Sequence, residues 1–165
     1  MKSGVAVAER IILVSAWIIT IIVLIIFIPK NRIREAQLIF LFKQLQTWLF
    51  GLIVANYGLI EYPMRLFQYA TRADFTFEFF IYPAVCVIFN LHYPQKKSWF
   101  RQAVHYVSYT TTITLFEIVI EKYTNIINYL HWTWYLTWIT ICVTFWFSRL
   151  YYVWFYKHKR EKQGV

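Results

Sequence analysis

Long apolar runs separated by short polar connections fill this 165-residue chain. The first run, 11–28, carries no charge, and only Ser15 and Thr20 interrupt its apolar side chains. A helix needs about 20 mostly apolar residues to cross roughly 30 Å of membrane hydrocarbon, because each residue adds about 1.5 Å. The pattern therefore predicts helices that cross a membrane. The five runs expected to span lie at about 11–28, 36–60, 75–91, 103–120 and 132–156.

The composition agrees with a membrane protein. The chain is 59% hydrophobic and only 15% charged, whereas a soluble domain carries about a quarter charged residues. No connection between the runs is long enough to separate domains. We therefore expect one integral membrane domain over residues 1–165, folded as an all-α bundle of five transmembrane helices.

The second run is less uniform than the first, because Lys43 and Gln44 interrupt its apolar residues. Two interpretations are open. Residues 36–46 lie along the membrane interface before the chain turns inward, or one helix continues and Lys43 extends to the near headgroups. Later in the run, Gly51 and Ala55 form a small-xxx-small pair, which permits close helix contact in lipid.

The third run contains a proline, Pro83. Proline removes one backbone hydrogen bond of a helix and kinks it. Membrane helices tolerate this when a neighbouring group bonds to the carbonyl that the proline leaves free. We therefore expect a kink near Pro83 and a donor from another helix beside it.

Basic residues divide unevenly between the two sides that five spans create. The side of the N-terminus has five, namely Lys2, Arg10, Arg65, Arg72 and Lys122. The opposite side has ten, namely Lys30, Arg32, Arg34, Lys96, Lys97, Arg101, Lys157, Lys159, Arg160 and Lys162. Cytoplasmic connections are enriched in lysine and arginine. The bias therefore predicts an N-terminus outside the cell and a C-terminus in the cytoplasm.

The net charge of +9 narrows the choice of partners. The basic residues flank apolar runs, where they would meet anionic lipid headgroups. We therefore expect membrane lipids as partners, with a homo-oligomer or other membrane proteins as further candidates, and no nucleic acid.

Cys86 and Cys142 lie deep inside apolar runs and have neither a disulfide pattern nor zinc spacing. The chain contains no P-loop, nucleophile elbow or HExxH motif, so we expect no enzyme, no cofactor and no metal.

Polar residues recur at helical spacing in the third and fourth runs. The third run has Asp74, Glu78, Tyr82, Cys86 and Asn90, and the fourth has Tyr106, Thr110, Thr114, Glu117 and Glu121. Each set forms one ridge along its helix. Ionisable groups within a bilayer usually face protein or water. We therefore expect both ridges to face the bundle interior, with Glu78 and Glu117 at a similar depth, about one turn from the outer surface.

Six residues make up this expected outer cluster, namely Asp74, Glu78, Glu117, Glu121, Arg65 and Arg72. Two interpretations of it remain open. In the functional one, a carboxylate-lined pocket opens outward and binds a cation, a proton or a polar ligand. In the structural one, Glu78 and Glu117 are neutral, or paired with Arg65 or Arg72, and simply hold helices together.

An inner polar cluster is expected from Asn90, His92, His105 and Arg149, which lie at a similar level near the other end of the helices. Arg149 can extend to the headgroups from there. Two histidines on different spans can ligate haem or a metal. A histidine at a helix end more often forms an interfacial hydrogen bond, so ligation is not the expected role.

From Asp74 onward the chain resembles a family of small, hydrophobic, uncharacterised multi-span membrane proteins of spore-forming Firmicutes such as Bacillus and Clostridium. The residues that carry the resemblance are Asp74, Tyr82-Pro83, Leu91-His92-Tyr93-Pro94, Glu117 at the end of the fourth span, and Arg149-Leu150. It covers roughly residues 60–156. Where the family often has Arg-Leu-His-Tyr, this chain has Arg149-Leu150-Tyr151-Tyr152, so any role of that histidine is absent here. The resemblance implies a bacterial cytoplasmic membrane and a sporulating organism, and it implies no activity.

Two functions follow as hypotheses. The first is a non-enzymatic structural or accessory membrane protein with a link to sporulation, which rests on the small size, the missing catalytic motifs and the resemblance. The second is a small transporter or channel for a cation or proton that uses Glu78 and Glu117. A membrane enzyme that acts on lipid has no support beyond scattered polar residues.

Overall fold

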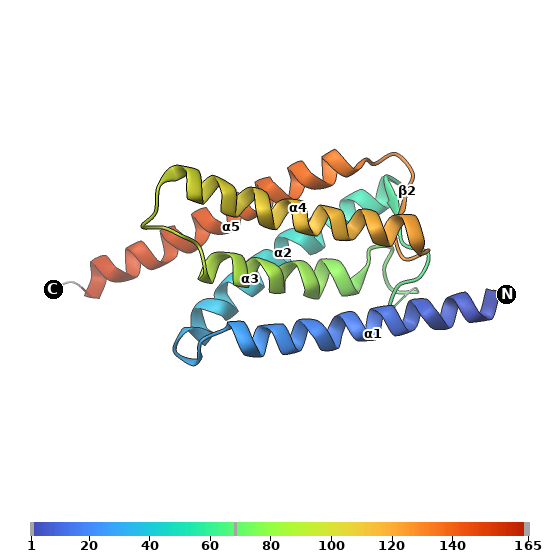
Figure 1. The fold of residues 1–165 in the computed structure, drawn as a ribbon, viewed down its shortest axis with the longest axis horizontal. Coiled ribbons are helices and arrows are strands. Elements are labelled where there is room, and N and C mark those ends of the chain that lie inside the picture. Colours follow the sequence, from blue (N-terminus) through green and yellow to red (C-terminus); the bar gives the residue numbers. More distant parts are fainter. Residues whose placement is uncertain (1, 68, 164–165) are drawn as a thin grey trace.

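The computed structural model describes residues 2–67 and 69–163, and the surroundings of side chains over 7–67 and 69–156. Within these residues the fold is all-helical, and its five α-helices run along the long axis of the molecule (Figure 1). The helices are α1 (Lys2–Phe27), α2 (Ile33–Asn56), α3 (Tyr82–Leu91), α4 (Trp99–Tyr123) and α5 (Trp134–Gln163). The short helical segments η1 (Lys30–Arg32) and η2 (Phe77–Ile81) precede α2 and α3, and the strands are β1 (Ile60–Glu61) and β2 (Asn128–Tyr129). Each predicted run thus contains one helix, and the all-α prediction is confirmed.

Three segments are long and apolar enough to cross a membrane, judged by length and composition alone. They are Val7–Phe27, Lys30–Asn56 and Trp99–Tyr123. The continuous unit Phe77–Leu91 is apolar but shorter. The described part of α5 is long, but it is not among these candidate spans. It contains many threonine, tyrosine and tryptophan residues, which are less hydrophobic than isoleucine and leucine. The five predicted spans are therefore supported as helices, and three of them as candidate spans.

The second predicted run forms a single unbroken helix, α2. This excludes a turn of the chain near residue 46. The other interpretation, in which Lys43 extends to the headgroups, is also wrong, because Lys43 is only 1% exposed. Its ammonium group donates a hydrogen bond to the hydroxyl of Thr144 in α5. The polar residues of this run therefore face neighbouring helices.

A π-helical segment, η2, lies just before Pro83. In η2 the N–H of Tyr82 donates to the carbonyl of Phe77, five residues earlier. Pro83 itself has no N–H to offer the carbonyl of Phe79. The wider turn therefore leaves two successive carbonyls, of residues 78 and 79, without a donor in their own helix.

Helix α2 supplies both missing donors. The hydroxyl of Thr47 donates to the carbonyl of Glu78 over 2.5 Å, and the side-chain amide of Gln44 donates to the carbonyl of Phe79 over 2.9 Å. The expected donor from another helix is therefore present. These two bonds hold η2 against α2, and so they set the position of the Glu78 side chain.

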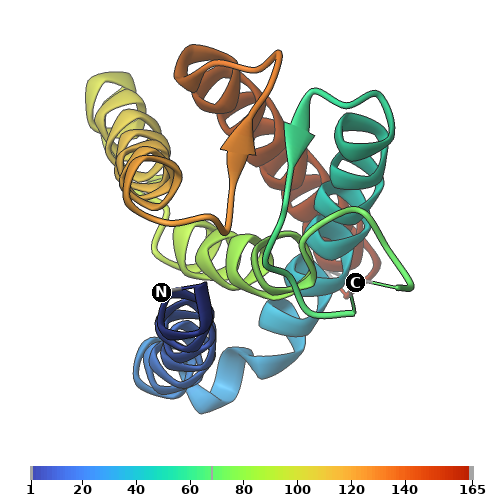
Figure 2. The ribbon, with the colours of Figure 1, turned by 90° about the vertical axis from the view of Figure 1, so that its right-hand side faces the viewer.

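A small sheet closes the end of the bundle at which the N-terminus lies (Figure 2). Helix α2 ends before Gly58, whose φ of +63° is a left-handed conformation that glycine adopts without strain. Strands β1 and β2 then pair antiparallel, with Ile60 opposite Tyr129 and Glu61 opposite Asn128. The pairing brings the segment after α2 and the segment after α4 to the same end of the bundle.

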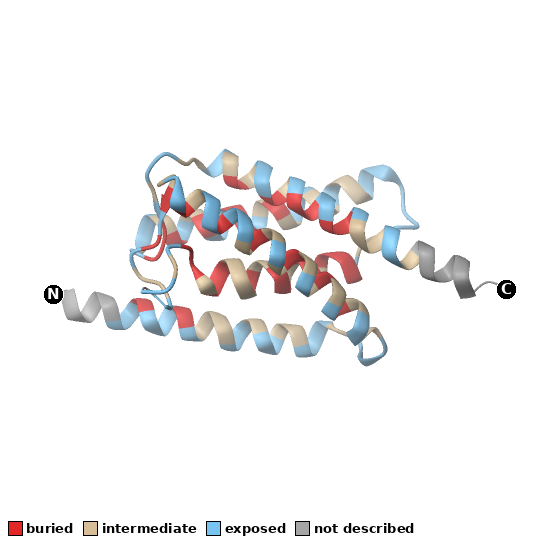
Figure 3. Cartoon of the chain, turned by 180° about the vertical axis from the view of Figure 1, so that it is seen from behind, coloured by how far each residue is buried: buried red, intermediate tan, exposed pale blue. Residues whose placement is uncertain are grey.

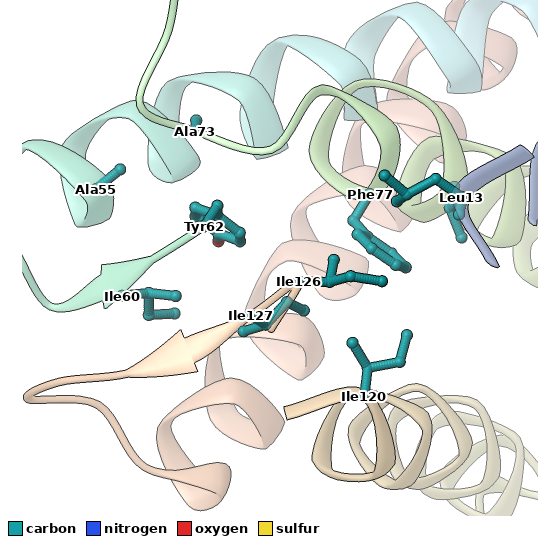
Figure 4. Packing of buried hydrophobic residues seen from close by; sticks show 10 residues of the cluster. Leu13, Ala55, Ile60, Tyr62, Ala73, Phe77, Ile120, Ile126 and Ile127 are labelled. Atoms are coloured by element: carbon teal, nitrogen blue, oxygen red, sulfur yellow. The ribbon is translucent and has the colours of Figure 1, made fainter. Parts of the chain in front are cut away.

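Two clusters of buried apolar side chains lie along the bundle. The first lies beside the sheet and joins α1, η2, α4 and the following turn through Leu13, Phe77, Ile120, Ile126 and Ile127 (Figure 4). The second is formed mainly by α2, α3 and α5 and includes Ile39, Val87, Phe89, Ile141 and Phe145. Residues of both clusters line the cavity described below.

Helix α1 is the most exposed of the three candidate spans, since only 6% of the residues in its most apolar 18-residue stretch are buried (Figure 3). Its contact face stacks Trp17 on Phe80 at a centroid distance of 4.1 Å. Near its N-terminal end the buried Glu9 accepts two hydrogen bonds from Asn125, one from the backbone N–H and one from the side-chain amide. The opposite face carries exposed isoleucines, such as Ile25 at 74%.

Candidate functional site

A partly open, mostly apolar cavity of about 230 Å³ lies in the bundle, between α2, η2, α4 and α5. Three ionisable side chains line it, Lys43, Glu78 and Glu117, together with the threonines Thr47, Thr137, Thr140 and Thr144. Most of the remaining lining is aliphatic or aromatic. We call this space the central cavity. Ionisable groups are seldom enclosed in an apolar bundle without a partner or a function.

Glu117 of α4 is the most completely bonded of the three groups, at 6% exposure. The hydroxyl of Tyr82 donates to its Oε2 over 2.6 Å. Its Oε1 accepts from the hydroxyls of Tyr129 over 2.6 Å and of Thr137 over 3.0 Å. Distances near 2.6 Å are typical of hydroxyl donors to a charged carboxylate. The donors come from α3, β2 and α5, so the fold assembles a cage around one carboxyl group.

Glu78 of η2 reaches the same cavity from the opposite side. Its Oε1 accepts a hydrogen bond of 3.2 Å from the hydroxyl of Tyr62, just after β1. Burial raises the pKa of Tyr62 well above its ordinary value, and the carboxylates of Glu78 and Glu117 raise it further. Tyr62 therefore stays a neutral donor over the physiological pH range.

Gly51 makes room for Glu78. A Cβ atom at position 51 would lie 2.8 Å from Cδ and 2.9 Å from Cγ of Glu78. Distances this short occur in essentially no real structure, so an added methyl group would displace the carboxyl group. The small residue predicted to bring two helices together thus accommodates the Glu78 side chain.

Lys43 completes the cavity and was not expected there. Its ammonium group lies 2.5 Å from the Thr144 hydroxyl and 4.8 Å from the centroid of the Phe145 ring. The buried face of α2 repeats every four residues through Ile39, Lys43, Thr47, Gly51 and Ala55. The same spacing that identifies the two acidic ridges would therefore have identified Lys43 as an interior residue.

Six of the ten ridge residues are buried and the other four are half-buried, but they do not all share one site. Glu78 and Glu117 line the central cavity, while Glu121 is half-buried one turn beyond it. Arg65 and Arg72 line a separate outer pocket of about 260 Å³ together with Glu61. Arg65 donates to the backbone carbonyls of Tyr62 and Thr71.

Asp74, the last member of the predicted outer cluster, holds the start of η2. Its Oδ1 accepts the backbone N–H of Phe77 over 2.7 Å, and its Oδ2 is buried without a partner among the described residues. Burial raises the pKa of Asp74 to about 6, against the opposing effects of the hydrogen bonds from Phe77 and Thr76 and the charge of Arg65. Its role is local, because it lies outside the central cavity.

The inner cluster is assembled only in part. Asn90 and Arg149 meet, since Arg149 donates to the Asn90 carbonyl. His92 and His105 instead hydrogen-bond to the backbone carbonyls of Ile88 and Phe89. Among the described residues, no three His, Cys, Asp or Glu side chains are placed to hold a metal ion.

Arg149 does not extend to the headgroups as expected. It is 8% exposed, and its guanidinium lies 4.2 Å from the Tyr93 ring centroid and 5.2 Å from that of Tyr152. Rings at such distances attract a cation. The aromatic pair therefore keeps Arg149 within the bundle, at the edge of a larger inner pocket.

No protein-family model, curated protein or solved structure matches this chain.

The central cavity carries one basic and two acidic groups in apolar surroundings. With all three groups ionised, the cavity has a net charge of −1, which one bound proton would neutralise. Hydroxyl groups of Tyr62, Tyr82 and Tyr129 surround the carboxylates and can pass or hold a proton. Proton binding is thus the chemistry for which the arrangement is suited.

Proposed function

We propose that this protein is a non-enzymatic integral membrane protein that binds protons in its central cavity and moves them across the bilayer. The chain would cross the bacterial cytoplasmic membrane five times, with the N-terminus outside. The observation that carries the proposal is that Lys43, Glu78 and Glu117 line one cavity. A link to sporulation remains a prediction from the resemblance.

The outer surface of the helices supports a bilayer as the solvent. Isoleucines on α1 are exposed to 60% at Ile11 and 74% at Ile25. In water such a surface is costly, whereas in hydrocarbon it is not. The span Val7–Phe27 has 21 residues, which is about 32 Å of helix and matches the hydrocarbon thickness.

The available oxygen ligands favour a proton over a metal cation as the bound species. A metal ion needs several oxygen ligands, whereas both oxygens of Glu117 already accept hydrogen bonds from hydroxyl groups. A proton adds no volume, and on the second oxygen of Glu78, whose Oε1 accepts from Tyr62, it leaves the hydrogen-bond cage of Glu117 in place. A net charge of −1 in hydrocarbon is unfavourable, so protonation is the simplest way to neutralise the cavity.

The lining suggests a route to the outer side. Ile60 and Tyr62 line both the central cavity and the outer pocket that contains Arg65 and Arg72. Movement of the Tyr62 side chain would therefore open one space to the other. Because Tyr62 also donates to Glu78, opening and proton binding would be coupled.

Proton flux into liposomes tests the proposal. The purified full chain is reconstituted, a potassium diffusion potential is imposed, and a trapped pH-sensitive dye reports proton entry. We expect flux above that of empty liposomes, a loss of at least tenfold in Glu117→Gln and Glu78→Gln, and no change in Glu121→Gln. Glu121 is the matched control because it lies one turn along the same helix and outside the cavity.

A folding check accompanies the flux measurement, since a variant that fails to fold would also be inactive. Each variant must keep the wild-type elution volume and helical circular dichroism. Flux equal to that of empty liposomes in the folded wild type would overturn the proposal. That result would favour the accessory role, which requires no movement of ions.

A further inference from the structure

The inner end of the bundle holds a second and larger pocket, of about 660 Å³. It lies where the turn between α1 and α2, the connection between α3 and α4, and the C-terminal half of α5 meet (Figure 1). Four basic residues line it, namely Arg32, Lys96, Lys97 and Arg149, and its lining contains no acidic residue. We call it the inner basic pocket. Four cations that converge on one open space make a positive field there.

Arg149 lines the buried side of this pocket. One of its nitrogens donates to the side-chain oxygen of Gln95 over 3.1 Å, and another lies 3.5 Å from the carbonyl of Asn90. Both acceptors are neutral, and within the described part of the chain Arg149 forms no ion pair with a carboxylate. A buried guanidinium without an anion is unfavourable, because its charge is removed from water without compensation. The arrangement is therefore incomplete without an external anion.

Arg32 on the facing side differs, because Glu35 already balances its charge. Its guanidinium lies 2.7 Å from Oε2 of Glu35, and the Tyr152 hydroxyl donates to the same oxygen over 2.6 Å. Arg32 is thus held in a fixed position at the pocket edge and donates to the Tyr152 oxygen and the Leu91 carbonyl. Lys96 and Lys97 are exposed at the opposite edge. The free positive charge of the pocket therefore comes from Arg149 and the two lysines.

We propose that the inner basic pocket binds a phosphate-bearing group. A phosphate oxygen pair matches the planar fork of an arginine, and lysine ammonium groups act as point charges toward the same anion. The pocket is open, and in the proposed orientation it faces the cytoplasm, where anionic headgroups and soluble phosphates both occur. The ligand is therefore a phospholipid headgroup or a free phosphate. This site is separate from the central cavity and does not depend on proton movement.

Ligand-induced stabilisation distinguishes the two sources. The full chain in an uncharged detergent is heated with inorganic phosphate, with phosphatidylglycerol added to the micelles, or with diacylglycerol, which has no phosphate. A ligand that binds only the folded state raises the melting temperature. We expect a rise with at least one phosphate-bearing probe and none with diacylglycerol. A response to phosphatidylglycerol alone assigns a lipid headgroup, and a response to inorganic phosphate assigns a free phosphate.

Variants locate the binding. Lys96→Gln/Lys97→Gln changes only exposed residues, so it should fold and should bind the active probe at least tenfold more weakly. Arg149→Gln should do the same. Arg101→Gln is the matched control, because Arg101 is exposed on the same side and does not line the pocket, and its affinity should equal that of wild type. Equal stabilisation by diacylglycerol, equal loss in Arg101→Gln, or no response to either phosphate-bearing probe would overturn the proposal.

Discussion

The hydroxyl of Tyr82 donates a 2.6 Å hydrogen bond to Oε2 of Glu117, and this bond joins the third helix to the fourth inside the bundle. Tyr129 and Thr137 donate to the other oxygen of the same carboxyl group. One side chain of α4 is thereby connected to α3, β2 and α5. Because these donors are far apart in the sequence, Glu117 helps to fix how the elements are placed relative to one another.

Removing one donor should weaken this arrangement. Tyr82→Phe deletes the hydroxyl that bonds to Glu117, and hydrogen bonds between membrane helices contribute about 1–2 kcal/mol in peptide systems. We expect the free energy of unfolding, measured by titration with sodium dodecyl sulfate, to fall by that amount. Tyr123→Phe, at an exposed position, is the control and should unfold like wild type. Equal unfolding of Tyr82→Phe and wild type would show that the bond contributes nothing.

A methyl group at position 51 should displace the Glu78 carboxyl group. In Gly51→Ala the new Cβ would meet Glu78 within 2.9 Å, so the carboxyl group must move and its bond to Tyr62 must stretch or break. We expect a loss of proton flux and only a small change in stability, because the flexible Glu78 side chain can shift and alanine favours a helix over glycine by about 0.5–1 kcal/mol. Glu78→Ala removes the clashing atoms, so the double variant should be more stable than the sum of the single effects predicts. Strict additivity would contradict a contact between these two positions.

The helical content and the interior ridges could be predicted from the sequence because both follow from local periodicity. Asp74, Glu78 and Asn90 recur every four residues, and such spacing determines a helix face whatever the neighbours are. The apolar runs and the spacing of the polar residues were therefore sufficient to predict the helices and their inward faces.

Contacts between distant segments could not be predicted in the same way. Strands β1 and β2 have two residues each, too few for an alternating pattern, and their pairing depends on the bundle that carries them. The position of Lys43 stays open between two interpretations at the level of sequence, because a single lysine in an apolar run is ambiguous until its partner is known. Thr144, its acceptor, lies 101 residues away. The depth of Arg149 likewise depends on Tyr93, which another connection supplies.

Asp74 should make stability depend on pH. Its pKa is about 6 in the folded chain against an ordinary value of 3.8, because burial disfavours the charged form. The folded state therefore holds the proton more tightly, so stability is greatest below about pH 4 and falls as the pH rises to about 6. A shift of this size corresponds to roughly 2–3 kcal/mol. Asp74→Asn cannot titrate, so its unfolding free energy should change less between pH 4 and pH 7. Parallel pH profiles of the variant and wild type would exclude this role.

Glu9 should hold the outer end of α1 to the rest of the bundle. It is 3% exposed and accepts both the backbone N–H and the side-chain amide of Asn125, over 2.8 and 2.9 Å. In Glu9→Ala the turn after α4 loses its acceptor, and local opening becomes easier because α1 has few other buried contacts. We expect backbone hydrogen exchange at Asn125 to accelerate at least tenfold, while exchange at Phe89, in the second apolar cluster, stays unchanged. Arg10→Ala changes the adjacent exposed residue and should leave both rates as in wild type. Equal acceleration at Asn125 and Phe89 would mean that Glu9 supports the whole bundle rather than this one attachment.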